Sequence, residues 1–218
     1  MNVNGRRRCR SMRGSMFTEP FGLIYIHGFN SSPQAYKANL MRDYLRECGR
    51  EDAFFAPELP FDPQQAMQLL VQCMEELVAR FGNRRVFIVG SSLGGYYGAY
   101  LAEQFQAAIA LINPSVEPYV TLNRYLGENT NVHTGERYIL TAQHAAILKE
   151  YRVDRLKLAA DYLLMVQTAD ETLDYRAAVL KYGDCTQLIE SGGCHGFDGF
   201  INHIPSIMAF FAGRSSAL

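Results

Sequence analysis

The sequence lacks several features that would place the protein in a specialised class. None of its apolar runs approaches the roughly 18–20 residues that a helix needs to cross a bilayer. Its N-terminus has no apolar core of a secretory signal. Its five cysteines are widely spread and form no CxxC pair, so they predict neither a zinc site nor a disulfide framework. Free thiols are typical of a reducing compartment, and we therefore expect a cytoplasmic protein. Because no apolar run is long enough to span a bilayer, we expect no membrane partner.

Acidic residues are absent from the first 16 positions, which contain five arginines, whereas the rest of the chain carries about six more acids than bases. An arginine-rich segment can bind nucleic acid or anionic lipid. We favour the plainer interpretation of residues 1–16 as a disordered basic leader, arising from a misassigned start or a cloning remnant. The acidic remainder argues against nucleic acid as a partner. We expect residues 17–218 to form one domain.

Short apolar runs alternate with amphipathic segments of helical period from residue 21 onward. The runs are continuously apolar, which is typical of a mainly parallel sheet with helices on both faces. The sequence thus predicts an α/β fold. Residues 114–160 are mostly polar and helical in pattern without a strong strand, and we expect a lid-like insertion over the edge of the sheet there. The predicted strands cover residues 21–27, 53–60, 84–90, 107–114, 162–168 and 186–191.

Residues 90–94 (Gly-Ser-Ser-Leu-Gly) fit the pattern G-x-S-x-G between a predicted strand and a predicted helix. Such a sharp turn strains the central residue, and small residues two places before and after it avoid clashes. Centring the pattern on Ser91 would put bulky Val89 at the first of these places, so Ser92 is the candidate nucleophile. The amide of Leu93, at the start of the helix, is a candidate oxyanion donor. The alternative is a structural glycine turn without chemistry.

A nucleophilic serine needs a base and an orienting carboxylate. His195 lies in a glycine-rich loop directly after the last predicted strand, where imidazole could reach the serine hydroxyl. Asp170 follows the preceding strand, and the order Ser92, Asp170, His195 is that of α/β-hydrolases. Asp174 is the rival acid, but a carboxylate near a helix N-terminus also has a purely structural explanation. We expect the remaining histidines to be structural or exposed: His27, His133, His144 and His203.

The second oxyanion donor is expected in the loop after the first strand, which begins with a His-Gly pair. Its glycine allows the backbone to turn so that the amide of Phe29 points into the site. Gly28, Tyr96 and Tyr119 are candidates for a small substrate pocket, although aromatic residues at such positions also serve as core or lid packing.

On these motifs the chain resembles the YqiA-type (UPF0227) esterase family of the α/β-hydrolase superfamily. The resemblance runs from about residue 23 to residue 211. It implies cleavage of carboxylic esters or thioesters of a small molecule by a Ser92–His195–Asp170 triad, with no metal and no cofactor. Cys194 replaces an asparagine expected from the family, and "QTADE" replaces the commoner "QTGDE". The segments that carry the resemblance are "YIHGFNSSP", "IVGSSLGGYYGAYLAE", "LINPSVEPY", "YLGENTNVHTGERYIL", "QTADETLDYRAAV" and "GGCHGFDGF".

Three alternatives stay open. An acyl-CoA thioesterase would use the same three residues, and a basic patch near the lid would favour it. A lyase or peroxidase could use the same scaffold, because a fold does not fix the reaction. A non-catalytic binding protein that kept the fold would fail to react with a fluorophosphonate probe. The sequence does not predict the oligomeric state.

Overall fold

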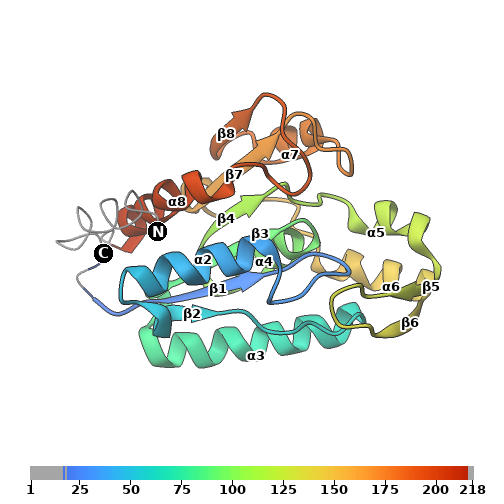
Figure 1. The fold of residues 1–218 in the computed structure, drawn as a ribbon, viewed down its shortest axis with the longest axis horizontal. Helices are drawn as coiled ribbons and strands as arrows, with labels where there is room; N and C mark the ends of the chain where they lie inside the picture. The colour runs from blue at the N-terminus through green and yellow to red at the C-terminus, as the bar shows by residue number, and fades with distance from the viewer. Residues whose placement is uncertain (1–16, 18, 216–218) are drawn as a thin grey trace.

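A central six-stranded sheet organises the computed structural model, which describes residue 17 and residues 19–215 (Figure 1). The strand order is β2-β1-β3-β4-β7-β8 and every neighbouring pair is parallel. The predicted parallel sheet is confirmed. Its strands are β1 (Gly22–Ile26), β2 (Phe54–Phe55), β3 (Val86–Ser91), β4 (Ala108–Ile112), β7 (Tyr162–Gln167) and β8 (Thr186–Glu190).

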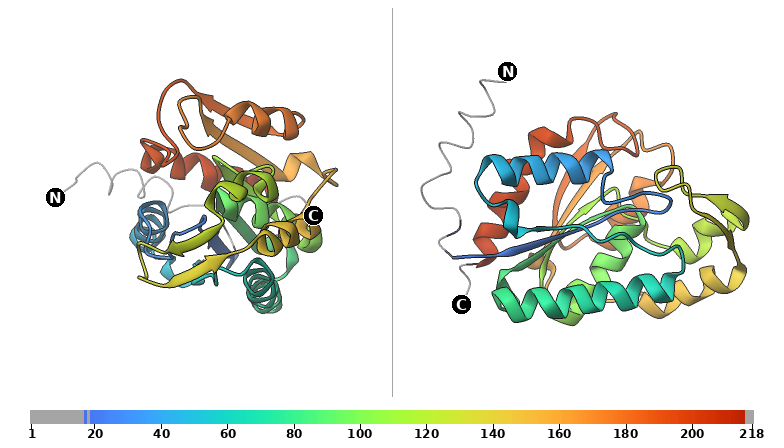
Figure 2. Two further views of the ribbon diagram at one scale, coloured as in Figure 1. Left: turned by 90° about the vertical axis from the view of Figure 1, so that its right-hand side faces the viewer. Right: turned by 60° about the horizontal axis from the view of Figure 1, so that its bottom comes forward.

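Helices cover both faces of the sheet, with α2 and α8 on one side and α3 and α4 on the other (Figure 2). Because successive strand side chains point to opposite faces, each inner strand contributes apolar side chains to the clusters on both faces of the sheet. In β1, Ile24 packs into one apolar cluster and Leu23 into the other. Burial on both sides explains why these strands are apolar throughout. The helices are α2 (Tyr36–Glu47), α3 (Pro63–Phe81), α4 (Leu93–Phe105), α7 (Tyr175–Lys181) and α8 (Phe200–Ser215).

The segment between β4 and β7 differs from the expectation of a mostly helical insertion. It contains the short helices α5 (Pro118–Thr121) and α6 (Ala142–Ile147), but also an antiparallel hairpin of β5 (Gly127–Thr130) and β6 (Arg137–Leu140). In β6, Tyr138 and Leu140 are buried while their neighbours are exposed. A strand buried on one face only has no continuous apolar run, which is why the pattern hid it. The hairpin lies beyond the end of the sheet toward which β1 points (Figure 1).

Two further observations bear on the sequence analysis. Within residue 17 and residues 19–215, no helix is long and apolar enough to span a membrane. Cys73, Cys185 and Cys194 are free thiols, whereas Cys48 is disulfide-bonded, which corrects the expectation of a free thiol at that position. The predicted basic leader, residues 1–16, lies outside the described residues.

The first turn of α4 packs directly on the end of β1. A Cβ atom added to Gly94 would lie 2.1 Å from the carbonyl oxygen of Ile26 and 2.5 Å from that of His27. A Cβ atom on Gly90 would lie 2.5 Å from the carbonyl oxygen of Gly94. The steric reason for the two flanking glycines of the G-x-S-x-G pattern is therefore confirmed.

We expect Gly94→Ala to lower the free energy of unfolding by roughly 3 kcal/mol or more, because the obstructing atoms are backbone oxygens that cannot rotate away. Urea denaturation followed by circular dichroism would measure the change. Gly213→Ala in α8 is the control, since no described atom beyond its chain neighbours and the backbone of its own helix lies within 4 Å of its added Cβ. It should leave stability unchanged or raise it by up to about 1 kcal/mol through helix propensity. Equal losses in both variants would contradict the packing argument.

Candidate active site

Ser92 stands alone between the last residue of β3 and the first residue of α4. Its backbone has φ 56° and ψ −122°, a conformation that costs a non-glycine residue on the order of 1–3 kcal/mol. Hydrogen bonds hold it there: its N–H donates to the Ile112 carbonyl at 3.1 Å, and its carbonyl accepts from the N–H groups of Gly95 and Ser115 at 3.0 Å each. The turn therefore holds the Ser92 hydroxyl beyond the carboxyl edge of the sheet.

His195 reaches Ser92 from the loop that follows β8. Its Nε2 lies 3.0 Å from Ser92 Oγ, and its Nδ1 lies 2.8 Å from Asp170 Oδ2. The Asp170 side chain is 2% exposed and that of His195 23% exposed. Because an ionised carboxylate can only accept, Nδ1 carries the proton and Nε2 is free to accept one from the serine. The structure thus brings together the three residues that the sequence singled out.

Asp170 is held as an anion by the backbone as well as by the histidine. Its Oδ1 accepts hydrogen bonds from the N–H groups of Thr172 and Leu173, each at 2.8 Å. Burial acts to raise the pKa of Asp170, but the bonds from His195 and the two amides outweigh it and hold that pKa below its ordinary value. The rival Asp174 instead caps α7, accepting from the N–H of Arg176 at 3.0 Å.

Two polar residues that the sequence analysis missed fasten the histidine loop to the sheet. Asn113 donates from Nδ2 to the carbonyls of Cys194 and His195 at 3.0 and 3.1 Å. Gln167 accepts at Oε1 from the N–H groups of Cys194 and Asp198 at 3.1 and 2.8 Å. The two are joined, since Asn113 Oδ1 accepts from the N–H of Gln167 at 3.0 Å. The sequence feature that could have identified Asn113 and Gln167 is a single amide side chain at the end of an otherwise apolar strand.

A lysine of α2, the helix that shares a face of the sheet with α8, also anchors this loop. Lys37 in α2 donates from Nζ to the Gly196 carbonyl at 3.0 Å. Burial lowers the pKa of Lys37 to about 8. Glu171, in the loop after β7, accepts a hydrogen bond from the N–H of His195 at 2.9 Å. The imidazole is thus oriented by contacts to α2, to β4 and β7, and to the loop after β7.

Two backbone N–H groups are available beside Ser92. Leu93 is the first residue of α4, so its N–H has no acceptor within the helix. The N–H of Phe29 makes no hydrogen bond to another described residue. A Cβ atom on Gly28 would lie 3.0 Å from Ser92 Cβ, so the backbone of this loop lies directly against the serine. These two N–H groups, of Leu93 and Phe29, are the ones that the sequence analysis predicted as oxyanion donors.

His27 holds the Phe29 loop in place. Its Nδ1 donates to the Gly28 carbonyl at 3.0 Å, and its Nε2 accepts from the N–H of Leu59 at 3.3 Å. Burial lowers the pKa of His27, which favours the neutral ring that this donor and acceptor pattern requires. The expected structural role of His27 is confirmed.

A cavity of about 270 Å³ opens next to Ser92 and His195. Neither Tyr96 nor Tyr119, which the sequence analysis named as pocket candidates, lines this cavity. Tyr96 is buried under the insertion and donates to the Leu148 carbonyl at 2.6 Å, and Tyr119 donates to Glu117 at 2.9 Å. Gly28 lines a smaller neighbouring cavity. The apolar part of the lining consists of Phe29, Leu93, Pro118, Leu122, Tyr125 and Leu173.

Residues 22–212 match the model of a family described as Uncharacterised protein family (UPF0227). The chain belongs to the UPF0227 family. UPF0227 proteins of Pectobacterium atrosepticum and Pectobacterium carotovorum are each 22% identical to it over 191 residues, covering 86% of this chain and 97% of the relative.

Solved structures extend the likeness in fold. A putative hydrolase from Agrobacterium vitis has a TM-score of 0.66 at 16% identity and covers 87% of each chain. Est1E from Butyrivibrio proteoclasticus has a TM-score of 0.65 at 14% identity and covers 92% of this chain and 90% of its own. The esterase domain of a Rhodothermus marinus protein has a TM-score of 0.63 at 16% identity, with 90% and 88% covered. This UPF0227 protein therefore has the α/β-hydrolase fold.

The lowered pKa of Asp170 makes the stability of this UPF0227 protein depend on pH. A carboxylate that is more acidic in the folded state stabilises it above the unfolded pKa of about 3.9 and loses this contribution as pH falls through the folded value. We expect Asp170→Asn to lower the free energy of unfolding by roughly 1–3 kcal/mol at pH 7. The difference from the wild type should shrink below about pH 4.

Urea denaturation of both proteins between pH 3 and pH 7 would measure this difference. Asp174→Asn is the matched control, because the Asp174 carboxylate caps a helix on the exposed surface and is screened by solvent. Its effect should depend less on pH. A pH-independent effect of Asp170→Asn would refute the assignment of the lowered pKa.

Proposed function

We propose that this protein is a serine hydrolase that cleaves carboxylic esters or thioesters of small molecules through an acyl-enzyme. The observation that carries the proposal is the unbroken hydrogen-bond chain from Ser92 Oγ to His195 to Asp170, at 3.0 and 2.8 Å, beside a cavity. A serine hydroxyl is a weak nucleophile unless an adjacent base accepts its proton, and this chain supplies the base and the group that orients it.

In the first half of the proposed reaction, Ser92 Oγ attacks the acyl carbonyl while His195 Nε2 takes its proton. Asp170 keeps the imidazole in the tautomer with a proton on Nδ1 and stabilises the imidazolium that forms. The proton then passes from Nε2 to the leaving alcohol or thiol, which departs as the acyl-enzyme forms. Because the Asp170 side chain is almost fully buried, its attraction to the imidazolium is weakly screened by water.

The negative charge on the attacked carbonyl oxygen would be stabilised by the N–H groups of Phe29 and Leu93, with the N-terminus of α4 adding its dipole. In the second half, His195 takes a proton from water as the water attacks the acyl carbon. It then returns that proton to Ser92 Oγ, which releases the acid. Every step uses groups of this chain, so the proposal calls for no metal and no cofactor.

The structural relatives support the same chemistry. Est1E has been solved with ferulic acid bound, and another relative is described as an esterase domain. We take a small-molecule acyl ester or thioester as the partner of this chain. The oxyester and thioester hypotheses share all three residues, so the reaction itself must be measured to separate them.

Ser92→Ala should lower the hydrolysis of 4-nitrophenyl acetate by at least about 10⁴-fold, because the nucleophile is lost while the fold is kept. Ser91→Ala is the matched control: this neighbouring serine is buried and lies within β3, so its loss should change the rate by less than about tenfold. The release of 4-nitrophenol measures both rates. A fluorophosphonate probe should label the wild type and Ser91→Ala but not Ser92→Ala. Persistent turnover by Ser92→Ala would refute the nucleophile, and an unlabelled, folded wild type would favour the non-catalytic alternative.

The size of the cavity predicts a preference for short acyl groups. Its volume of about 270 Å³ is slightly below that of ordinary ligand pockets, which span roughly 300–1,000 Å³. We expect kcat/KM to fall by about tenfold or more between butanoyl and palmitoyl substrates, in both the 4-nitrophenyl ester and the CoA thioester series. The ratio between the two series at equal chain length decides between esterase and thioesterase. A rate that rises steadily with chain length would contradict the size argument.

A further inference from the structure

Ser115 has a buried hydroxyl that the proposed mechanism does not use. It follows β4, is 4% exposed and lines the cavity next to Ser92. Its N–H donates to the Ser92 carbonyl at 3.0 Å, which fixes it beside the nucleophile. Its Oγ has no hydrogen-bond partner among the described residues. Leaving such a group unpaired costs roughly 1–3 kcal/mol. Because the Oγ atom itself is buried from solvent, it does not contact a ligand in the cavity as the structure stands.

Arg124 lies on the rim of the same cavity in a fixed position. Its Nε donates to the Thr121 carbonyl at 3.0 Å, and its Nη2 donates to the Thr172 carbonyl at 3.2 Å. The guanidinium also lies 5.4 Å from the ring centroid of Tyr125. These contacts connect the insertion to the loop after β7. They involve neutral partners only, so the positive charge of Arg124 is left uncompensated.

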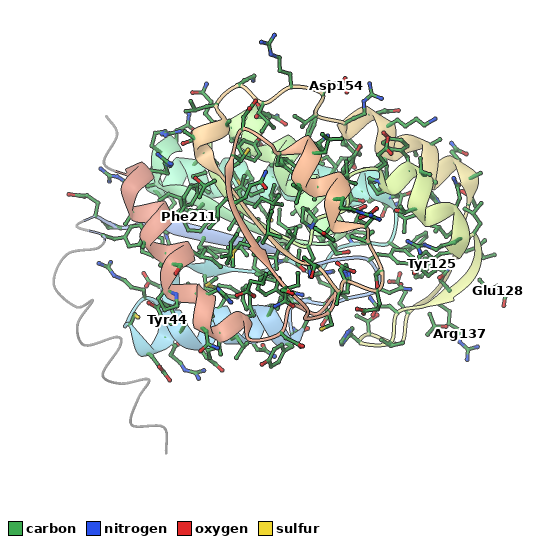
Figure 3. All side chains as sticks on the ribbon, turned by 90° about the horizontal axis from the view of Figure 1, so that it is seen from above. Tyr44, Tyr125, Glu128, Arg137, Asp154 and Phe211 are labelled. Carbon is green, nitrogen blue, oxygen red and sulfur yellow. The ribbon has the colours of Figure 1, made fainter. Side chains whose placement is uncertain are left out.

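No carboxylate of the described residues forms an ion pair with Arg124. Asp170 is buried and already bonded to His195. Glu128 and Arg137 extend outward from the hairpin, away from the sheet (Figure 3). Among the described lining residues, Arg124 is the one side chain with a permanent charge, and much of the remaining lining is apolar.

We propose that the cavity selects esters that carry a carboxylate, which pairs with Arg124. The inference rests on the proposed hydrolase activity and narrows its substrate class. A planar guanidinium matches the geometry of a carboxylate. Because Arg124 is exposed at the rim, the pair depends on this match of geometry rather than on weak screening. The carboxylate sits on either the acyl or the alcohol part of the ester, and the two substrate arms below distinguish these cases.

The test compares kcat/KM for an anionic ester with that for its neutral methyl or ethyl ester. Monoethyl succinate carries its charge on the acyl part, and diethyl succinate is its neutral counterpart. Acetoxyacetate carries its charge on the alcohol part, and methyl acetoxyacetate is its neutral counterpart. Acid release in a pH-stat measures all four. In at least one pair, Arg124→Gln should lower the anionic-to-neutral ratio by about tenfold or more. Arg124→Lys should keep part of the ratio because it keeps the charge without the planar fork.

Arg137→Gln is the matched control: it removes an arginine that points away from the molecule and should leave the ratio unchanged. An anionic-to-neutral ratio that is the same in the wild type, Arg124→Gln and Arg137→Gln would overturn the inference while leaving the hydrolase intact.

A binding measurement separates this failure from failure of the proposed function. Calorimetric titration of the Ser92→Ala protein with monoethyl succinate and with acetoxyacetate should show one of them binding, and Arg124→Gln in that background should weaken its affinity by about tenfold or more. If the wild type hydrolyses no ester but this binding persists, the proposed function fails and the anion site stands. If the neutral esters are hydrolysed and neither anionic ester binds, the anion site fails alone.

Discussion

The candidate site depends on the close approach between the first turn of α4 and the end of β1. With a carbonyl oxygen of β1 2.1 Å from where a Cβ of Gly94 would be, no larger residue fits at this crossing. The crossing leaves a single residue between β3 and α4, and this residue must adopt a positive φ. The strain at Ser92 is offset by its hydrogen bonds to Ile112, Gly95 and Ser115. Packing of the backbone therefore fixes the position of a side chain before any chemistry is considered.

The other members of the site follow from the parallel sheet. Parallel strands all end at one edge, so the residues that follow them meet there. Ser92 follows β3, Asn113 follows β4, Asp170 follows β7 and His195 follows β8. Asn113 makes this edge a connected unit, since it accepts from the backbone of β7 and donates to the carbonyls of the histidine loop.

The geometry of the parallel sheet also explains which parts of the structure could be predicted from the sequence. Strands buried on both faces leave continuous apolar runs, so the sheet, and the residues just beyond each strand, could be placed. The β5–β6 hairpin is buried on one face and left no such run. The cavity lining could not be deduced, because it depends on how the insertion folds back, which placed Tyr96 in the core and Arg124 at the rim. Gln167 was missed because a strand-end amide carries no motif.

The insertion and the acid loop are joined by an unbroken series of contacts. Arg124 donates to the Thr172 carbonyl, the N–H of Thr172 donates to Asp170 Oδ1, and Asp170 Oδ2 accepts from His195. A displacement of the Arg124 guanidinium would therefore act on the loop that holds the carboxylate. Since the geometry of Asp170 sets the tautomer and orientation of His195, the side chain that we propose to pair with the substrate also helps to hold the imidazole toward Ser92. The proposed selection of substrate and the positioning of the imidazole thus depend on one connected set of hydrogen bonds.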